Sequence, residues 1–131
     1  MSMLAETYLA SGRPDEGLEA VSYGLTSGEK SGQRFCAARL HRLKGELLLM
    51  QNSSNIEQAE GCYRTAIAIA RRQGAKLFEL SATTSLARLL ARQYGRDEAR
   101  TMLGDIYNWF TEGFDTPDLK DAKALLDELA T

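Results

Sequence analysis

The chain of 131 residues is long enough to bury the core of one domain without disulfides or a metal. Its 44% hydrophobic and 26% charged residues are ordinary for a soluble globular protein, and no apolar run approaches the roughly 20 residues that a membrane-spanning helix needs. The net charge of −2 argues against nonspecific binding to nucleic acid, which requires a net basic face.

Helical signals run through nearly the whole sequence, and no stretch alternates apolar and polar residues over the length of a strand. The chain has only two prolines, Pro14 and Pro117, and each lies where a first helical turn is expected. We predict seven helices, at about residues 2–11, 14–27, 33–51, 55–73, 76–93, 96–112 and 117–130.

Capping residues mark the ends of several of these helices. We expect Ser54 or Asn55 to cap the start of the fourth helix and Gly74 to end it. Gly113 is expected to end the sixth helix, and Thr116 is the expected N-cap of the seventh.

Two segments far apart in the sequence have the same pattern. "LAETYLASGRPDEGLEAV" from Leu4 aligns with "LARLLARQYGRDEARTML" from Leu86, including a Gly-Arg turn and Asp-Glu. A middle unit fits the same scheme with a turn that is two residues longer. The small residues Gly17, Ala59 and Ala99 correspond and are separated by 42 and 40 residues. The sequence therefore predicts three helical hairpins of one kind.

This pattern resembles the tetratricopeptide repeat, in which small residues let helices approach closely and larger residues fill the space between them. In the middle unit Gly45, Ala59 and Ala66 are the small residues, and Tyr63 is expected to wedge between the helices. The other two units carry the pattern through Leu4, Ala5, Tyr8, Gly17, Val21 and Gly24, and through Leu86, Ala87, Leu90, Ala99, Leu103 and Ile106. The period of 40–42 exceeds the 34 residues of that family, and longer helices resembling those of large bacterial regulators would explain it.

The resemblance implies an all-α array of helical hairpins forming a single domain over residues 1–131. Its parts are hairpin one (1–30), hairpin two (31–74), hairpin three (75–113) and a capping helix (114–131). The alternative is a plain helical bundle with alanine-rich seams, but three aligned units with a shared turn favour the repeat.

The two ends of this array have different expected properties. We expect Trp109, Phe110 and Phe114 to form a hydrophobic cap with the leucines of the last helix, because a terminal repeat needs cover; the alternative is a ligand-stacking site. The first hairpin is expected to be the weakest part, since Gly17 and Gly24 lie within its second helix.

The sequence carries no recognisable catalytic or cofactor motif. His41 is the only histidine and is expected to be a partly exposed helix residue, and Cys36 and Cys62 have no CxxC spacing. Neither GxxxxGK[ST] nor GxGxxG occurs. We therefore predict a protein that is not an enzyme and uses no cofactor or metal.

The resemblance also predicts a binding groove, because the first helix of each tetratricopeptide hairpin lines the inner surface of the array. The residues expected there beside the apolar seams are Arg39, Arg42, Glu46, Ser81, Thr84, Arg88 and Arg92. Arginine suits carboxylate or phosphate recognition, so an acidic peptide or an anionic metabolite is the expected ligand. The alternative is an ordinary solvated face. The asparagines of the chaperone-binding members are absent, since Glu6 and Glu46 stand at comparable positions.

The predicted function is that of a scaffold that binds a protein partner, with a sensor for a small anionic metabolite as the alternative. The closing stretch "YNWFTEGFDTPDLKDAKALLDEL" resembles the C-terminal end of bacterial predicted ATPases and nucleotide cyclases, which implies a role in signal transduction with the catalytic parts outside this chain.

Location and association are predicted from the chain start and the charge distribution. No signal peptide is recognisable, so we expect a cytoplasmic protein whose cysteines stay reduced. Residues 1–30 carry a net charge of −3, residues 31–100 carry +6 and residues 101–131 carry −5. Acidic ends flanking a basic middle, together with an uncovered first hairpin, lead us to expect a homodimer.

Overall fold

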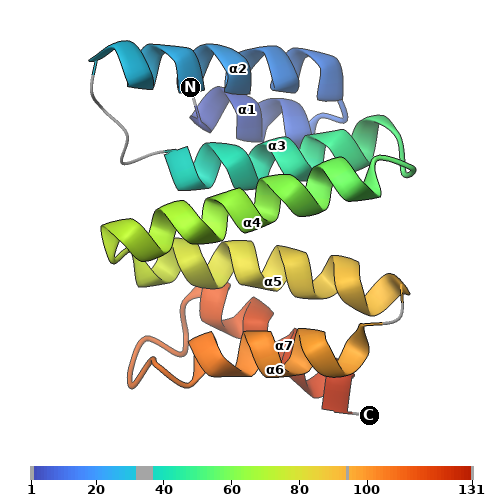
Figure 1. Cartoon of the computed structure of the whole chain (residues 1–131), viewed down its shortest axis with the longest axis vertical. Coiled ribbons are helices and arrows are strands. Elements are labelled where there is room, and N and C mark those ends of the chain that lie inside the picture. Colours follow the sequence, from blue (N-terminus) through green and yellow to red (C-terminus); the bar gives the residue numbers. More distant parts are fainter. Residues whose placement is uncertain (1, 32–36, 94, 131) are drawn as a thin grey trace.

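The computed structural model describes residues 2–31, 37–93 and 95–130, and these form seven α-helices (Figure 1). The helices are α1 Ser2–Ala10, α2 Pro14–Ser31, α3 Ala37–Gln51, α4 Ile56–Gln73, α5 Lys76–Gln93, α6 Arg96–Tyr107 and α7 Pro117–Ala130. No described residue belongs to a strand. The prediction of an all-helical protein is confirmed for this part of the chain.

The turn after α4 forms as its sequence predicts. Gly74 adopts a left-handed conformation with φ of 68°, which costs a residue without a side chain little. The N–H of Ala75 then bonds the carbonyl of Ala70 at 2.9 Å, which closes the last helical turn. The start of α4 differs in detail, because the Asn55 side chain makes no capping bond and instead donates to the Leu48 carbonyl at 3.0 Å. Asn55 therefore ties the loop back to α3.

Two helix ends were wrongly predicted. Helix α2 continues to Ser31 instead of stopping near Ser27. Helix α6 ends at Tyr107 instead of residue 112, because the N–H groups of Trp109 and Phe110 bond carbonyls only three residues back, at 3.2 and 3.1 Å. The segment that follows is rich in aromatic, β-branched and glycine residues, which favour a turn over a further helical turn.

The helices pack in chain order, and the odd-numbered helices form a layer of their own. Each helix contacts the next one along the chain, and α3 also contacts α1 and α5, while α5 contacts α7. The backbones of the described even-numbered helices do not approach one another in this way. Figure 1 shows the resulting stack, with α1 and α2 at one end and α6 and α7 at the other. Four helices therefore present neighbouring faces on one side of the molecule.

Small residues set the distances between helices, as predicted. A Cβ atom on Gly45 would lie 2.6 Å from the ring of Tyr63, and one on Gly17 would lie 2.6 Å from the side chain of Leu47. Tyr63 is fully buried, and so is Ala59 of the same helix, α4. The ring of Tyr63 therefore fills the space that a glycine on α3 leaves open.

The last helix covers the core, but the aromatic cluster before it does not. Helix α7 buries Leu119, Ala122, Leu125 and Leu129. In contrast, Trp109 is 57% exposed and Phe114 is 45% exposed. The predicted aromatic cap is therefore wrong for these two rings, because the early end of α6 places them in a surface connection.

Candidate functional site

A cleft of about 250 Å³ lies among helices α1, α3, α4 and α5. Its lining residues are Leu9, Glu46, Leu49, Met50, Tyr63, Ser85, Arg88, Leu89 and Arg92. Most of them come from α3 and α5, which are neighbours in the layer of odd-numbered helices. Met50 is 42% exposed, so the cleft is accessible to a ligand from the solvent.

The polar part of the cleft is organised around one carboxylate. The hydroxyl of Ser85 donates to Glu46 Oε1 at 2.8 Å. Burial, the charge of Glu46 and a hydrogen bond to it raise the pKa of the Tyr63 phenol, while Arg42 lowers it by a smaller amount. Two hydroxyl groups, one from α4 and one from α5, therefore hold the Glu46 carboxylate in place. Because they already stabilise its negative charge, a ligand does not have to supply all of that stabilisation.

Two arginines on one face of α5 form the basic part of the cleft. Arg88 and Arg92 are four positions apart, so their side chains leave the helix on the same side. Arg88 Nη2 also donates to Asp121 Oδ1 on α7 at 3.0 Å. Arg92 makes no ion pair among the described residues, so its guanidinium is the more available of the two.

The remaining lining is apolar. Leu9, Leu49 and Leu89 come from three different helices, and together with Met50 they surround the polar groups. A site of this composition offers a surface for a hydrophobic side chain beside a place for an anion.

The structure divides the predicted groove residues. Glu46, Arg88 and Arg92 line one cleft. Arg39 instead forms an ion pair with Glu6 of α1, to which its Nε donates at 3.1 Å, and it is not among the cleft residues.

Arg42 and Thr84 also lie outside the cleft lining. Thr84 is wrong as a groove residue, because it is buried and its hydroxyl donates to the Leu80 carbonyl within α5 at 2.9 Å. Ser85 was missed, although its position three residues before Arg88 places both on one helical face.

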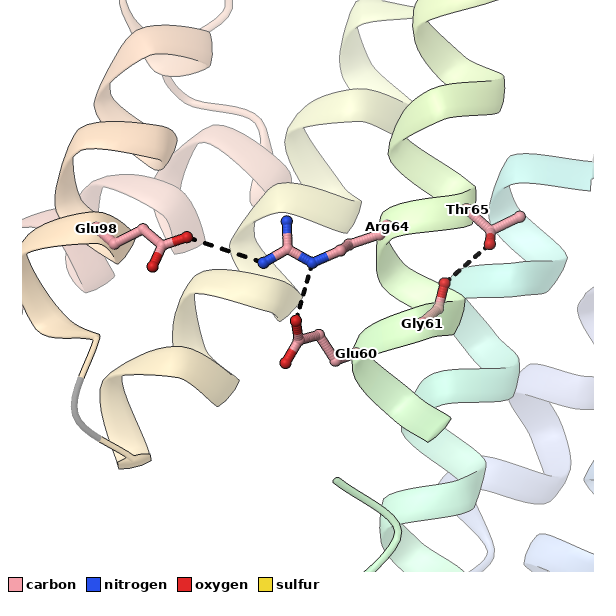
Figure 2. A network of polar contacts seen from close by, with 5 residues as sticks. All are labelled: Glu60, Gly61, Arg64, Thr65 and Glu98. Carbon is pink, nitrogen blue, oxygen red and sulfur yellow. Dashed lines mark hydrogen bonds and ion pairs between the residues drawn. The ribbon is translucent and has the colours of Figure 1, made fainter. Parts of the chain in front are cut away.

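A second polar network lies on the even-numbered helices and does not belong to the cleft (Figure 2). Arg64 of α4 contacts Glu60 one turn earlier at 2.9 Å and Glu98 of α6 at 3.8 Å. Exposed ion pairs of this kind contribute at most about 1 kcal/mol. This network links α4 to α6 weakly.

The residues considered for other chemistry do not gather at a site. Cys62 carries a half-buried free thiol, and burial raises its pKa, with Lys44 acting in the opposite sense. Cys36 lies outside the described residues. His41 is half-buried on α3, as expected for a partly exposed helix residue.

No group of three or more His, Cys, Asp or Glu side chains in the described ranges is placed to hold a metal ion. Within the same ranges, every helix is too short or too polar to cross a membrane.

Comparison of the chain with protein-family models, curated proteins and solved structures finds no match.

Proposed function

We propose that the chain is a tetratricopeptide-like array of three hairpins closed by α7. The order of helix contacts supports this, because each second helix packs on the first helix of the next hairpin and the first helices pack on one another. The close approach at Gly45 and Tyr63 gives further support. The three hairpins are then α1 with α2, α3 with α4 and α5 with α6, close to the ranges 1–30, 31–74 and 75–113 expected from the sequence, with the capping helix in 114–131.

We further propose that this array binds an acidic segment of a protein partner in the cleft between α3 and α5 and performs no catalysis. The observation that carries this proposal is the pairing of Arg88 and Arg92 with an apolar lining. An aspartate or glutamate of the partner binds the arginines through charge-assisted hydrogen bonds, and a hydrophobic neighbour of that residue packs on the leucines.

The size of the cleft favours a peptide over an enclosed small molecule. Its volume of about 250 Å³ is below the roughly 300–1,000 Å³ of typical small-molecule sites. A volume of this order holds one or two side chains of a segment whose backbone lies across the opening. We place this module in a cytoplasmic signalling protein, as the C-terminal part of an ATPase or nucleotide cyclase.

The test is a binding titration with a fluorescein-labelled peptide of alternating Asp-Leu and Glu-Leu pairs. We expect Arg92→Ala to weaken binding by about 10-fold or more, because a hydrogen bond to a charged group contributes roughly 1.5–3 kcal/mol. Arg100→Ala is the matched control, since Arg100 is an exposed arginine of α6 outside the cleft. The proposal is wrong if both variants bind the peptide as tightly as the wild type and show the same dependence on salt.

The alternative is a sensor that holds a small anionic metabolite in the same cleft. The placement of Arg88 and Arg92 in one cleft favours it, since two guanidinium groups can bind one anion. A thermal shift produced by a dicarboxylate or a nucleotide, lost in Arg92→Ala and not accompanied by peptide binding, would select this alternative.

A further inference from the structure

A buried carboxylate near the turn between α4 and α5 has one oxygen without a hydrogen bond. Glu79 is 4% exposed, and its Oε2 accepts a hydrogen bond from Arg71 Nε at 3.0 Å. Its Oε1 is buried and has no hydrogen-bond partner among the described residues. A buried charged oxygen in this state is costly and is a place where a further donor would be stabilising.

A second cation, Lys76, lies near this oxygen and near an aromatic ring. Lys76 Nζ forms an ion pair with Glu79 Oε1 at 3.6 Å, which is too long for a hydrogen bond. The same ammonium lies 5.5 Å from the centre of the Trp109 ring, close to the limit of about 6 Å for cation–π attraction. Trp109 is more than half exposed, and its ring lies nearly perpendicular to that of Phe110, with ring centres 5.2 Å apart. One ammonium group thus lies near both a carboxylate oxygen and an exposed aromatic ring.

We propose that Glu79 Oε1 and the Trp109 ring form a binding site for a lysine ammonium of a protein partner, which Lys76 occupies as an internal competitor. The site takes an ammonium because only one carboxylate oxygen lacks a hydrogen bond: Arg71 holds the other, so the bidentate pairing that a guanidinium prefers is blocked. None of these residues lines the cleft between α3 and α5, and the ligand has the opposite charge. The inference is therefore independent of the proposed function.

Displacement of Lys76 is expected to be inexpensive. Its ammonium makes no hydrogen bond to Glu79 in its present position, and its side chain is 36% exposed, so it can return to water. A partner ammonium that reaches Oε1 at hydrogen-bond distance gains the interaction that Lys76 leaves unmade. The internal competitor lowers the apparent affinity by the fraction of molecules in which the site is open.

The test uses the fluorescence of Trp109, which is the only tryptophan of the chain. The wild-type chain and its Lys76→Ala variant are titrated with Nα-acetyl-lysine N-methylamide, whose side-chain ammonium is free, at constant ionic strength. The neutral N-acetyl-norleucine methylamide is the matched probe without the ammonium. We expect a saturable change with the lysine probe alone, and about two- to fivefold tighter binding by Lys76→Ala, as expected for removal of an exposed cation–π competitor.

A second variant tests the carboxylate. Glu79→Gln in the Lys76→Ala background is expected to lose the saturable change while its circular-dichroism spectrum stays helical. If this variant does not fold, the comparison of wild type with Lys76→Ala decides the matter. The proposal is overturned if Lys76→Ala shows no saturable change, responds equally to the neutral probe, or binds no more tightly than the wild type.

Discussion

Gly45 and Gly61 are both helix residues, but they differ in what a methyl group on their Cα atoms would meet. At Gly45 it would meet the Tyr63 ring at 2.6 Å, whereas at Gly61 it would find nothing within 4 Å. Tyr63 is fully buried, so its ring cannot move aside cheaply. The same substitution therefore has opposite consequences at the two positions.

We predict that Gly45→Ala lowers the free energy of unfolding by about 0.5–2 kcal/mol, because overpacking costs roughly 1–3 kcal/mol and better helix propensity returns part of it. Gly61→Ala should raise the same quantity by about 0.5–1 kcal/mol. Urea unfolding followed by circular dichroism measures both. Equal effects of the two substitutions would show that α3 and α4 are not held at the distance described.

The sequence predicted the kinds of residue that line the cleft better than the individual residues that do so. The arginines of α5 and Glu46 could be identified because helical spacing places them beside the apolar seams. Thr84 and Ser85 could not be told apart, since they are neighbours on α5 and both are buried, and the packing of α5 decides that Ser85 rather than Thr84 reaches Glu46. The pairing of Arg39 with Glu6 depends on the contact between α1 and α3, which no spacing within one helix reveals.

At the scale of the helices, α2 and α5 differ in how many other helices they contact and in how many of their side chains are buried. Helix α5 contacts four other helices and buries most of its middle, including the polar residues Thr83, Thr84 and Ser85. Helix α2 contacts only α1 and α3, and among its described side chains only Ala20 and Val21, beside Gly17, are buried. The apolar area that holds the first hairpin in place is therefore much smaller.

We predict that the amides of α1 and α2 exchange with deuterium faster than those of α4 and α5. Local opening requires less free energy where few apolar contacts are broken, and the glycines of α2 reduce its helix propensity further. Hydrogen exchange followed by mass spectrometry of peptides from each helix measures this order. Equal protection of the first hairpin and of α5 would contradict the prediction.

Helix ends were predictable where a single residue decides them and not elsewhere. Gly74 ends α4 because its left-handed conformation is required for the turn. The end of α6 depends instead on whether the aromatic residues after Tyr107 have a core to pack on, and α7 already covers that core with its own leucines. Trp109 is left at the surface for this reason, which the sequence of α6 alone does not indicate.

At the scale of the whole molecule, the uncovered side of α2 is the surface on which a second copy is expected. In Figure 1 α2 forms one edge of the stack, with no helix beyond it. Its exposed side chains include Glu19 and Tyr23, the second of which is 63% exposed, whereas the exposed Asp15 accepts a hydrogen bond from Gln51 of α3 at 2.8 Å. In a two-fold dimer the same surface meets itself, so we expect Tyr23 to lie within the interface and the acidic groups of α2 in the two copies to come close to one another.

This arrangement makes a definite prediction about salt. Like charges across the interface repel, and added salt screens them, so the dimer should become more stable as ionic strength rises. Tyr23→Ala should shift the protein towards the monomer, since it removes the largest exposed apolar group of α2. Light scattering over a range of protein concentrations, at low and high salt, measures both effects. Leu77→Ala is the control, because Leu77 is also exposed but belongs to α5. A wild type that stays monomeric at high micromolar concentration, at both low and high salt, would refute dimerisation. A dimer that dissociates when salt is added would instead indicate that the acidic α2 faces a basic surface of the second copy.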